Sequence, residues 1–237
     1  MRNKKRAFFS TLLMLCLLLS CCAAAAFADQ TRKNSVYELY SVDGHYEDGV
    51  GNSENYSFHV PQILDDTDDA EEINTEIAER FGRLVETQFA NMESGVSLWS
   101  WTTEWKSHWS GDQIFLVVRS YMNGDIEDYA AYAYDFGTGS RVTNAMILEQ
   151  RGISEEEYLE NLKEKVTFLF NDQYTPPPAG VQSSISHDDL LNSTLSWLDL
   201  EQPMYVNEFG EIVTIVKIAS IPGSGWYYTF ATPFVYG

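Results

Sequence analysis

Cysteine is scarce in this chain and confined to one end of it. All three cysteines, Cys16, Cys21 and Cys22, lie close to the N-terminus, and the rest of the chain has none. This absence excludes a disulfide framework, a thiol nucleophile and a cysteine-ligated zinc site in the remaining residues. The folded domain must therefore be held together by its hydrophobic core.

Positive charge is scarce as well. The chain has 15 Lys and Arg against 35 Asp and Glu. Four of the cationic residues and no acidic ones fall within residues 1–28, so the remainder has 11 cations, 35 acids and a net charge of −24. This excludes nucleic acid as a partner, because phosphate binding needs clustered Lys and Arg. The negative net charge favours basic partners or cations through long-range attraction. The alternative is that it only keeps an exported protein soluble.

Catalytic and metal-binding patterns are missing too. The chain has four histidines, His45, His59, His108 and His187. No two of them have the sequence spacing that is typical of metal ligands. The sequence His187-Asp188-Asp189 is better explained as the start of a helix. Ser224 stands between glycines but lacks the G-x-S-x-G elbow, and no carboxylate pair stands out. We expect no catalytic residues, no metal and no cofactor.

One long hydrophobic run is present, at the N-terminus. Four basic residues precede Ala7–Ala28, which contains no charged residue and ends in the A-x-A site Ala26-Phe27-Ala28. This pattern predicts a signal peptide over residues 1–28, cleaved near Ala28, and a location outside the cell or in its envelope. Two alternatives stay open: lipidation at Cys21, and an uncleaved membrane anchor, since this run could span a ~30 Å hydrocarbon core.

Residues 29–35 are expected to form a short leader before the first strands. Strands are predicted at Val36–Tyr40 and Tyr56–Val60, with turns at Asp43-Gly44 and Gly51-Asn52. Pro61 should end the second strand, because proline cannot donate to a ladder.

Amphipathic helices are predicted at three places. Apolar residues recur at helical spacing from Ile73 to Phe89, with a cap formed by Asp68 and Glu71. Ser154-Glu155-Glu156-Glu157 is a capping box ahead of a second long helix. A shorter helix is expected over His187–Trp197.

Strands account for most of the remaining pattern. They are predicted after Val96 and at Ile114–Val118, Tyr129–Phe136, Met204–Asn207, Ile212–Ile218 and Trp226–Phe234. The glycines of Asp135–Ser140 suit a tight turn. This order predicts an α+β fold, with a largely antiparallel sheet packed against two long amphipathic helices.

Three indoles share one face of the strand that begins near Val96. Trp99, Trp101 and Trp105 alternate with Ser100, Thr102 and Glu104. Such indoles can stack on sugar rings or anchor a protein partner, and they can equally fill the space between a sheet and a helix. Both interpretations stay open.

Four stretches together resemble the extracellular domain of RsiV-type anti-sigma factors, which also occurs as the N-terminal module of PdaC-like polysaccharide deacetylases. They are Val60–Ile63 with Glu72–Ile77, similar to "IP.L … IN..I"; Tyr134–Thr143, similar to "FDL.TGK.IT"; the helix from Ser154; and Met204–Val213, similar to "FYLT.DGLVI". The resemblance covers residues 36 to 235 and divides them into an N-terminal half, 36–140, and a C-terminal half, 141–237.

The resemblance implies an α+β sensing or binding domain, which in RsiV-type proteins binds lysozyme. It also implies a ligand-facing loop near the end, where the family has "EIAPYAAG" and this chain has Lys217–Gly225. Two further departures are expected: no cytoplasmic sigma-binding segment, since few residues precede Ala7, and no C-terminal deacetylase domain.

These observations predict a non-catalytic binding module of the bacterial cell envelope, with a basic protein such as lysozyme or a wall polymer as partner. The alternative is a hydrolase or deacetylase that modifies peptidoglycan or polysaccharide at an unrecognised site. The expected ligand-binding residues are Trp99, Trp101, Trp105, Pro222, Gly223, Ser224, Gly225 and Trp226.

Overall fold

The computed structural model describes residues 35–95, 101–122, 126–176, 185–220 and 225–234. The predicted signal peptide, nearly all of the predicted leader, and four of the expected site residues, Trp99, Pro222, Gly223 and Ser224, lie outside these ranges. Within the described residues, no helix is long and apolar enough to cross a membrane.

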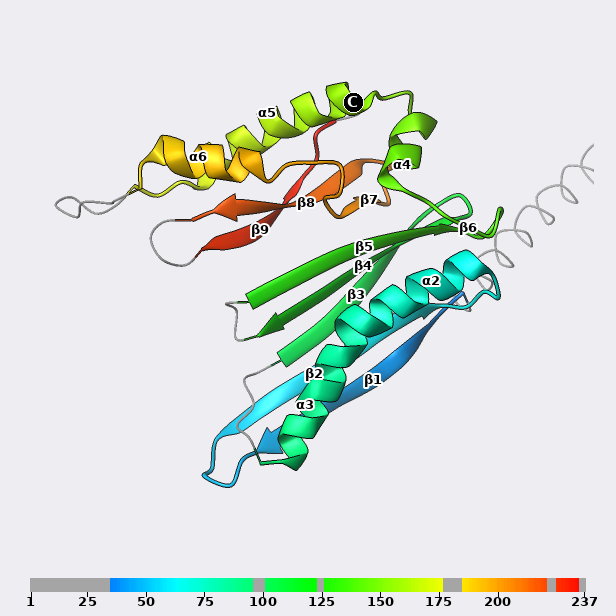
Figure 1. Ribbon diagram of the computed structural model, residues 1–237, viewed down its shortest axis with the longest axis vertical. Coiled ribbons are helices and arrows are strands. Elements are labelled where there is room, and N and C mark those ends of the chain that lie inside the picture. The colour runs from blue at the N-terminus through cyan, green and yellow to red at the C-terminus, as the bar shows by residue number, and fades with distance from the viewer. Residues whose placement is uncertain (1–34, 96–100, 123–125, 177–184, 221–224, 235–237) are drawn as a thin grey trace, which may run out of the picture.

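Residues 36–141 contain the strands of a six-stranded sheet, and the strands lie side by side in the order of the sequence (Figure 1). Its neighbours are antiparallel except β2 and β3, which run parallel through two residue pairs, Ser57–Thr102 and Phe58–Thr103. The strands are β1 (Val36–Glu47), β2 (Ser53–Ile63), β3 (Trp101–Ser110), β4 (Gln113–Met122), β5 (Ile126–Asp135) and β6 (Ser140–Arg141).

Two predicted boundaries in this sheet are wrong. Asp43 and Gly44 lie inside β1, where they pair with Ser57 and Tyr56, so only the turn at Gly51, with a φ of 89°, is present. Pro61 lies inside β2 rather than ending it. The strand tolerates this proline because the β1–β2 register shifts between Glu38 and Tyr40, opposite Pro61, and proline is accepted at such irregularities.

A long helical segment connects the two parallel strands and covers one face of the sheet (Figure 1). It consists of α2 (Asp68–Ile77), a π-helical turn η1 (Ala78–Gly82) and α3 (Arg83–Glu93). The predicted cap is wrong by one residue: Thr67 is the N-cap, and its Oγ1 accepts from the backbone N–H of Ala70. Asp68 instead lies in the first turn, where its negative charge interacts favourably with the positive end of the helix dipole.

The second half of the chain supplies three helices and a three-stranded antiparallel sheet. Two helices begin where expected. Ser154 Oγ accepts from the N–H of Glu157, which is one half of the predicted capping box, whereas Ser186, a cap not predicted from the sequence, forms a complete capping box with Asp189. The elements are α4 (Asn144–Gln150), α5 (Glu155–Gln173), α6 (His187–Ser196), β7 (Met204–Val206), β8 (Ile212–Ala219) and β9 (Trp226–Ala231).

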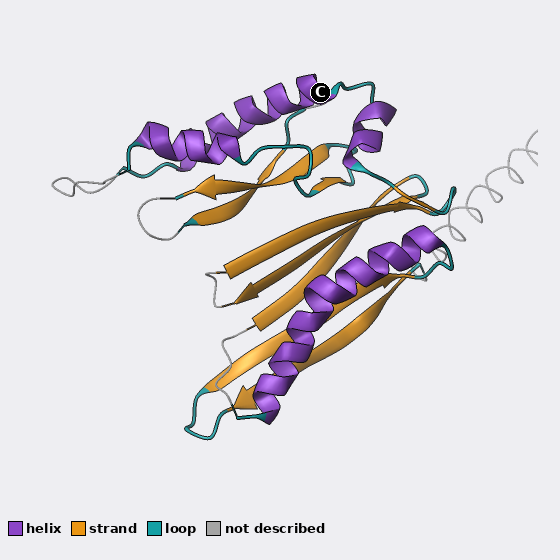
Figure 2. Ribbon diagram, in the orientation of Figure 1, coloured by secondary structure: helices purple, strands orange, loops and turns teal. Residues whose placement is uncertain are grey.

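These elements stack in four layers: the α2–α3 helix, the large sheet, the small sheet, and α5 with α6 (Figure 2). Alternation along β5 divides its side chains between the layers. Ala130, Tyr132 and Tyr134 join the core beneath the α2–α3 helix. Tyr129 faces the small sheet, where its ring lies 4.9 Å from that of Tyr228.

The predicted α+β class is confirmed, and the sheets are largely antiparallel as expected. The parallel β2–β3 pair is the exception, because the long helical connection returns the chain in the same direction. The expected boundary between residues 140 and 141 falls inside β6, and the two-part division stays a prediction.

Candidate functional site

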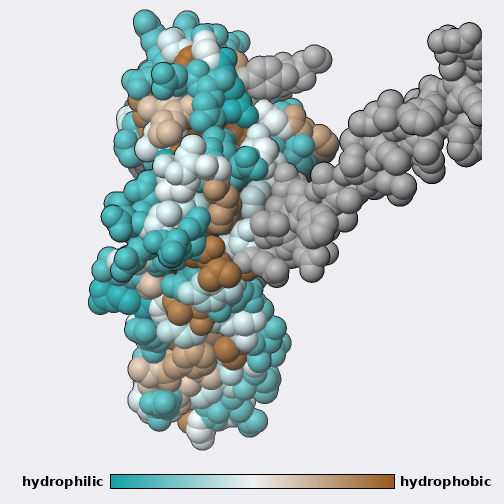
Figure 3. All heavy atoms as spheres, turned by 90° about the vertical axis from the view of Figure 1, so that its right-hand side faces the viewer, coloured by the Kyte–Doolittle hydropathy of each residue, from teal (hydrophilic) through white to brown (hydrophobic). Residues whose placement is uncertain are grey.

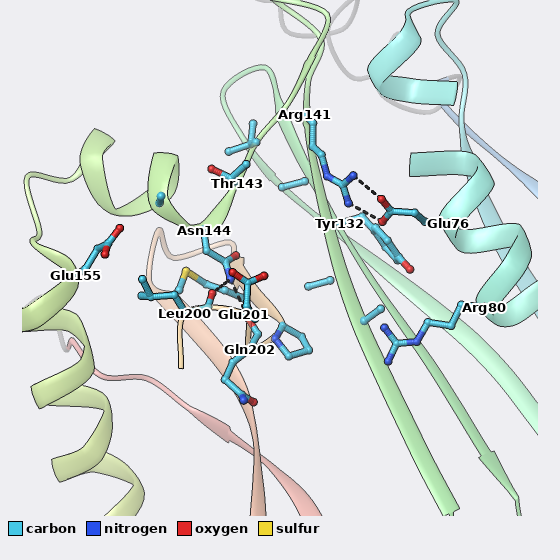
Figure 4. A pocket seen from close by; sticks show the side chains of 17 residues that line it. Glu76, Arg80, Tyr132, Arg141, Thr143, Asn144, Glu155, Leu200, Glu201 and Gln202 are labelled. Atoms are coloured by element: carbon cyan, nitrogen blue, oxygen red, sulfur yellow. Dashed lines mark hydrogen bonds and ion pairs between the residues drawn. The ribbon is translucent and has the colours of Figure 1, made fainter. Parts of the chain in front are cut away.

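A hollow of about 570 Å³ lies over the outer edge of β5 (Figure 4). Its floor is the segment Ala130–Ala133, and its walls come from segments far apart in the sequence. In Figure 4, Glu76, Arg80 and Arg141 lie on one side of the hollow, and Asn144, Glu155 and Glu201 lie on the other. Its volume is in the range of ordinary ligand pockets.

Two ion pairs form the helical wall. Arg141 donates from Nη1 and Nη2 to the two carboxylate oxygens of Glu76, each at 2.6 Å. Arg80 binds both oxygens of Asp128, at 2.8 and 2.6 Å. The bond from Arg141 lowers the pKa of Glu76, so this pair stays charged at neutral pH. Burial raises the pKa of Tyr132 between them to about 12.

The opposite wall is fixed by one amide. Asn144 at the start of α4 donates from Nδ2 to the backbone carbonyls of Leu200 and Gln202, at 2.6 and 2.9 Å. These bonds hold the segment before β7 in place. Glu155 and Glu201 also line this wall, and neither takes part in an ion pair within the described residues.

A second hollow of about 590 Å³ lies on the other side of α2, beside the end of β2. Its charged lining residues are all acidic, namely Asp65, Asp66, Glu71 and Glu79. Asp65 accepts a 2.8 Å hydrogen bond from the hydroxyl of Tyr134, whereas Asp66, Glu71 and Glu79 are exposed. We call this hollow the acidic hollow.

The described indoles of β3 pack against the core beneath the α2–α3 helix. Trp101 and Trp105 are partly buried there, and Trp105 Nε1 donates to Glu38 at 2.8 Å. Trp101 Nε1 is buried and has no hydrogen-bond partner among the described residues. This position matches the core-packing interpretation of the indoles. Their assignment as ligand-binding residues stays a prediction.

The other described members of the expected set lie on the small sheet. Trp226 opens β9 and is 51% exposed, with Lys217 Nζ 5.0 Å from its ring centre. Gly225 precedes it with a φ of 79°, which the turn into the strand requires. Trp226 belongs to β9 and the indoles of β3 to the core of the other sheet, so the structure does not join these residues in one site.

The histidines are engaged in separate contacts. His59 lies within 3.1 Å of Glu38, His108 within 3.1 Å of Glu208, and His187 within 2.9 Å of Asn171. His45 contacts Asn55 and Ser53. Within the described ranges, no group of three His, Cys, Asp or Glu side chains is placed to hold a metal ion.

The β5 hollow is not anticipated by the sequence patterns above. Arg141 and Glu76 are 65 residues apart, and only the fold brings them together. One local signal exists: Ala130, Ala131 and Ala133 are small residues in a strand otherwise rich in aromatic side chains. Such a run leaves more room around the strand than aromatic side chains would, but it does not by itself indicate a hollow.

Comparison with known proteins gives structural similarity only. No protein-family model matches the chain, and no curated protein matches its sequence. A DUF3298 family protein from Pseudomonas aeruginosa PAO1 is similar, with a TM-score of 0.46, 11% identity, and coverage of 83% of this chain and 88% of that one. A DUF3298 family member from Bacteroides fragilis NCTC 9343 has a TM-score of 0.37, 12% identity, and coverage of 81% and 88%. At these scores, no functional residue is transferred from those proteins to this chain.

Proposed function

We propose that this chain is an exported, non-catalytic binding module of the cell envelope and that its partner is a basic polypeptide, such as a lysozyme-like protein. The acidic hollow carries this proposal. Four acidic residues line this single cavity, and its lining contains no Lys or Arg. Carboxylates gathered in this way attract cations, and the net charge of −24 beyond residue 28 adds long-range steering.

The surface and the sequence both support this proposal. On the face shown in Figure 3, hydrophilic residues dominate and hydrophobic ones form small groups, mainly in its middle and lower parts. A polar surface of this kind suits recognition through charge. The sequence motifs also resemble the extracellular domain of RsiV-type proteins, which binds lysozyme, and this resemblance supports a basic protein as the partner.

Calorimetric titration with lysozyme tests the proposal directly. We expect binding that weakens steeply as salt rises, because exposed charges are screened within ~10 Å at 0.1 M. The triple variant Asp66→Asn, Glu71→Gln, Glu79→Gln should weaken it roughly tenfold or more. The matched control is Glu156→Gln, Glu160→Gln, Glu164→Gln, which removes the same charge from exposed positions of α5.

Two results would contradict the proposal. One is the absence of any heat of binding with lysozyme at low salt. The other is release of soluble product from labelled peptidoglycan by the purified chain, which would favour a wall-modifying enzyme instead. Equal weakening by the two triple variants would show that net charge rather than the acidic hollow is recognised.

A further inference from the structure

The outer edge of β5 lacks a neighbouring strand along most of its length. β6 pairs with it only at Tyr134 and Asp135, and the chain then turns away at Thr143 to begin α4. No other strand of the described residues pairs with this edge. An unpaired edge presents backbone donors and acceptors to an extended chain that reaches it, and here the available stretch lies between Tyr129 and Ala133, whose carbonyls already accept hydrogen bonds.

The outward backbone groups of β5 can be identified from two hydrogen bonds. The carbonyl of Ala133 accepts from the N–H of Val142 at 2.8 Å, and that of Tyr129 accepts from Arg80 at 3.0 Å. Alternate residues of an antiparallel strand direct their backbone groups to the same edge. The N–H and C=O of Ala131, midway between them, therefore point into the hollow.

The shape of the hollow suits an extended chain. Ala130 and Ala133 are buried and Ala131 is partly buried, so the floor carries no large side chain apart from Tyr132. The α2 helix forms one wall and the segment before β7 forms the other, which makes the hollow a groove along the strand. A strand laid in it would continue the line of β6 beyond Val142.

The charge of the groove selects the chemistry of its occupant. Its two cations are neutralised, Arg141 by Glu76 and Arg80 by Asp128. Glu155 and Glu201 line the opposite wall without an ion-pair partner among the described residues. Unpaired carboxylates beside an open strand edge favour Lys and Arg side chains.

We propose that an extended, basic segment of a partner protein adds to the edge of β5 as a further strand. Its backbone pairs with Ala131, and its cationic side chains face Glu155 and Glu201. This inference rests on the proposed function and adds a second contact for the same basic partner, on the other side of α2 from the acidic hollow. A second copy of this chain is the less suitable occupant, because it would bring the same unpaired carboxylates against each other.

The first experiment measures binding of a short peptide of alternating Lys and Val, with blocked ends, to the full-length chain in mild detergent. A peptide of alternating Glu and Val is the control for charge. We expect saturable binding of the Lys peptide and none of the Glu peptide. Equal binding of the two peptides would overturn the charge assignment.

The second experiment locates the peptide by amide hydrogen exchange followed by NMR. The amide of Ala131 should exchange roughly tenfold more slowly at saturating peptide, because it gains a ladder hydrogen bond. The amides of Ala130 and Tyr132 point toward β4 and should not change. An unchanged exchange rate at Ala131 while the peptide binds would overturn strand addition. So would protection of Ala131 that appears without peptide and grows with protein concentration, because it would show that a second copy of the chain occupies the edge.

Substitutions of one residue separate the backbone donor from the side chain. Ala131→Pro removes only an outward N–H and leaves the β4–β5 ladder bonds, a position where proline is tolerated. It should weaken Lys-peptide binding roughly tenfold, whereas Ala131→Val, which keeps the donor, should bind within about threefold of wild type. Glu155→Gln with Glu201→Gln should weaken binding at low salt without touching the strand.

The outcome for lysozyme distinguishes the two proposals. If wild type fails to bind lysozyme, the proposed function is wrong. If wild type and Ala131→Pro bind lysozyme and the Lys peptide equally well, only strand addition is wrong. A circular dichroism spectrum and melting curve for each variant establish that it is folded, and the exchange measurement on wild type needs no variant.

Discussion

Arg80 on η1 donates through Nη2 to the backbone carbonyl of Tyr129 on β5, at 3.0 Å. The same guanidinium binds both carboxylate oxygens of Asp128, so the helical segment is attached to the edge strand by three hydrogen bonds. The bond to Asp128 raises the pKa of Arg80, which keeps the side chain charged at any ordinary pH. Arg80 therefore closes one end of the groove over β5, and Val142 closes the other.

The N-cap of α2 should be more sensitive than its first-turn acids. Thr67 Oγ1 accepts from the N–H of Ala70 and also contacts the hydroxyl of Tyr134 at 2.8 Å. Thr67→Ala should lower the free energy of unfolding, measured in urea, by about 1–2 kcal/mol. Thr67→Ser keeps a capping hydroxyl and should therefore lose only a small part of that free energy. Asp68→Ala should cost less than Thr67→Ala; the reverse order would contradict this capping assignment.

The hydrogen bond between Tyr158 and Thr214 lies fully buried between α5 and the small sheet. The two hydroxyls are 2.7 Å apart. Either Tyr158→Phe or Thr214→Val leaves a buried hydroxyl without its partner, which costs about 1–3 kcal/mol. The double variant should cost much less than the sum, because both polar groups are then gone. A double-mutant cycle in which the two costs simply add would refute the coupling.

The core beneath the α2–α3 helix should respond strongly to a cavity. Leu116 on β4 is fully buried in it. Leu116→Ala should destabilise the fold by about 2–5 kcal/mol, since the lost methyl groups leave a space that the surroundings fill only in part. Leu64→Ala is the matched control, because Leu64 is 59% exposed and its loss should cost less than about 0.5 kcal/mol.

The first hairpin should show a pH-dependent contribution from His59. Burial alone would lower the pKa of His59, but hydrogen bonds to Glu38 and Asp43, and their charges, outweigh it and raise the pKa. Hydrogen bonding to Ser57 and His59 lowers the pKa of Asp43. For Glu38, bonds to Ser41, Trp105 and His59 outweigh the effect of burial and lower the pKa.

The sign of the pH dependence follows from these directions. A raised folded pKa gives stabilisation that is complete below the unfolded value of about 6.5 and is lost as pH rises through the folded value. Lowered carboxylate pKa values give stabilisation that is lost in acid. The advantage of wild type over His59→Gln should therefore peak near pH ~5.5, at about 0.5 kcal/mol for so accessible a site. A difference that grows toward pH ~8 in urea titrations would contradict this.

Much of the fold could be predicted because its signals are local. The apolar repeat through Ile73, Ile77 and Phe81 predicts a buried helix face, and those residues are fully buried. The capping residue Ser154 likewise predicts the start of α5. The prediction that Pro61 ends the second strand is wrong because β2 tolerates this proline opposite a register shift in β1. No local sequence pattern around Pro61 encodes that shift.

The candidate site is harder to predict for a related reason. The groove over β5 is made by a strand edge, and whether an edge is paired depends on where the chain goes after β6. Its walls join Glu76 to Arg141 and Asn144 to Leu200, contacts between residues 65 and 56 positions apart. The indoles of β3 illustrate the opposite case, since their alternation is local and fits both a core and a binding face.

The parallel junction of the large sheet has a consequence for how the molecule opens. Among the described residues, Ser57–Thr102 and Phe58–Thr103 are the pairs that register β2 against β3, whereas β4 and β5 pair along ten consecutive positions, from Gln113–Asp135 to Met122–Ile126. The described part of this junction is held by these two pairs, by the helix that connects β2 to β3, and by the hydrogen bond from Trp105 on β3 to Glu38 on β1. We expect separation at this junction to release β1 and β2 as one ribbon and to leave the β3–β5 meander intact, which would give the sheet two units of local unfolding.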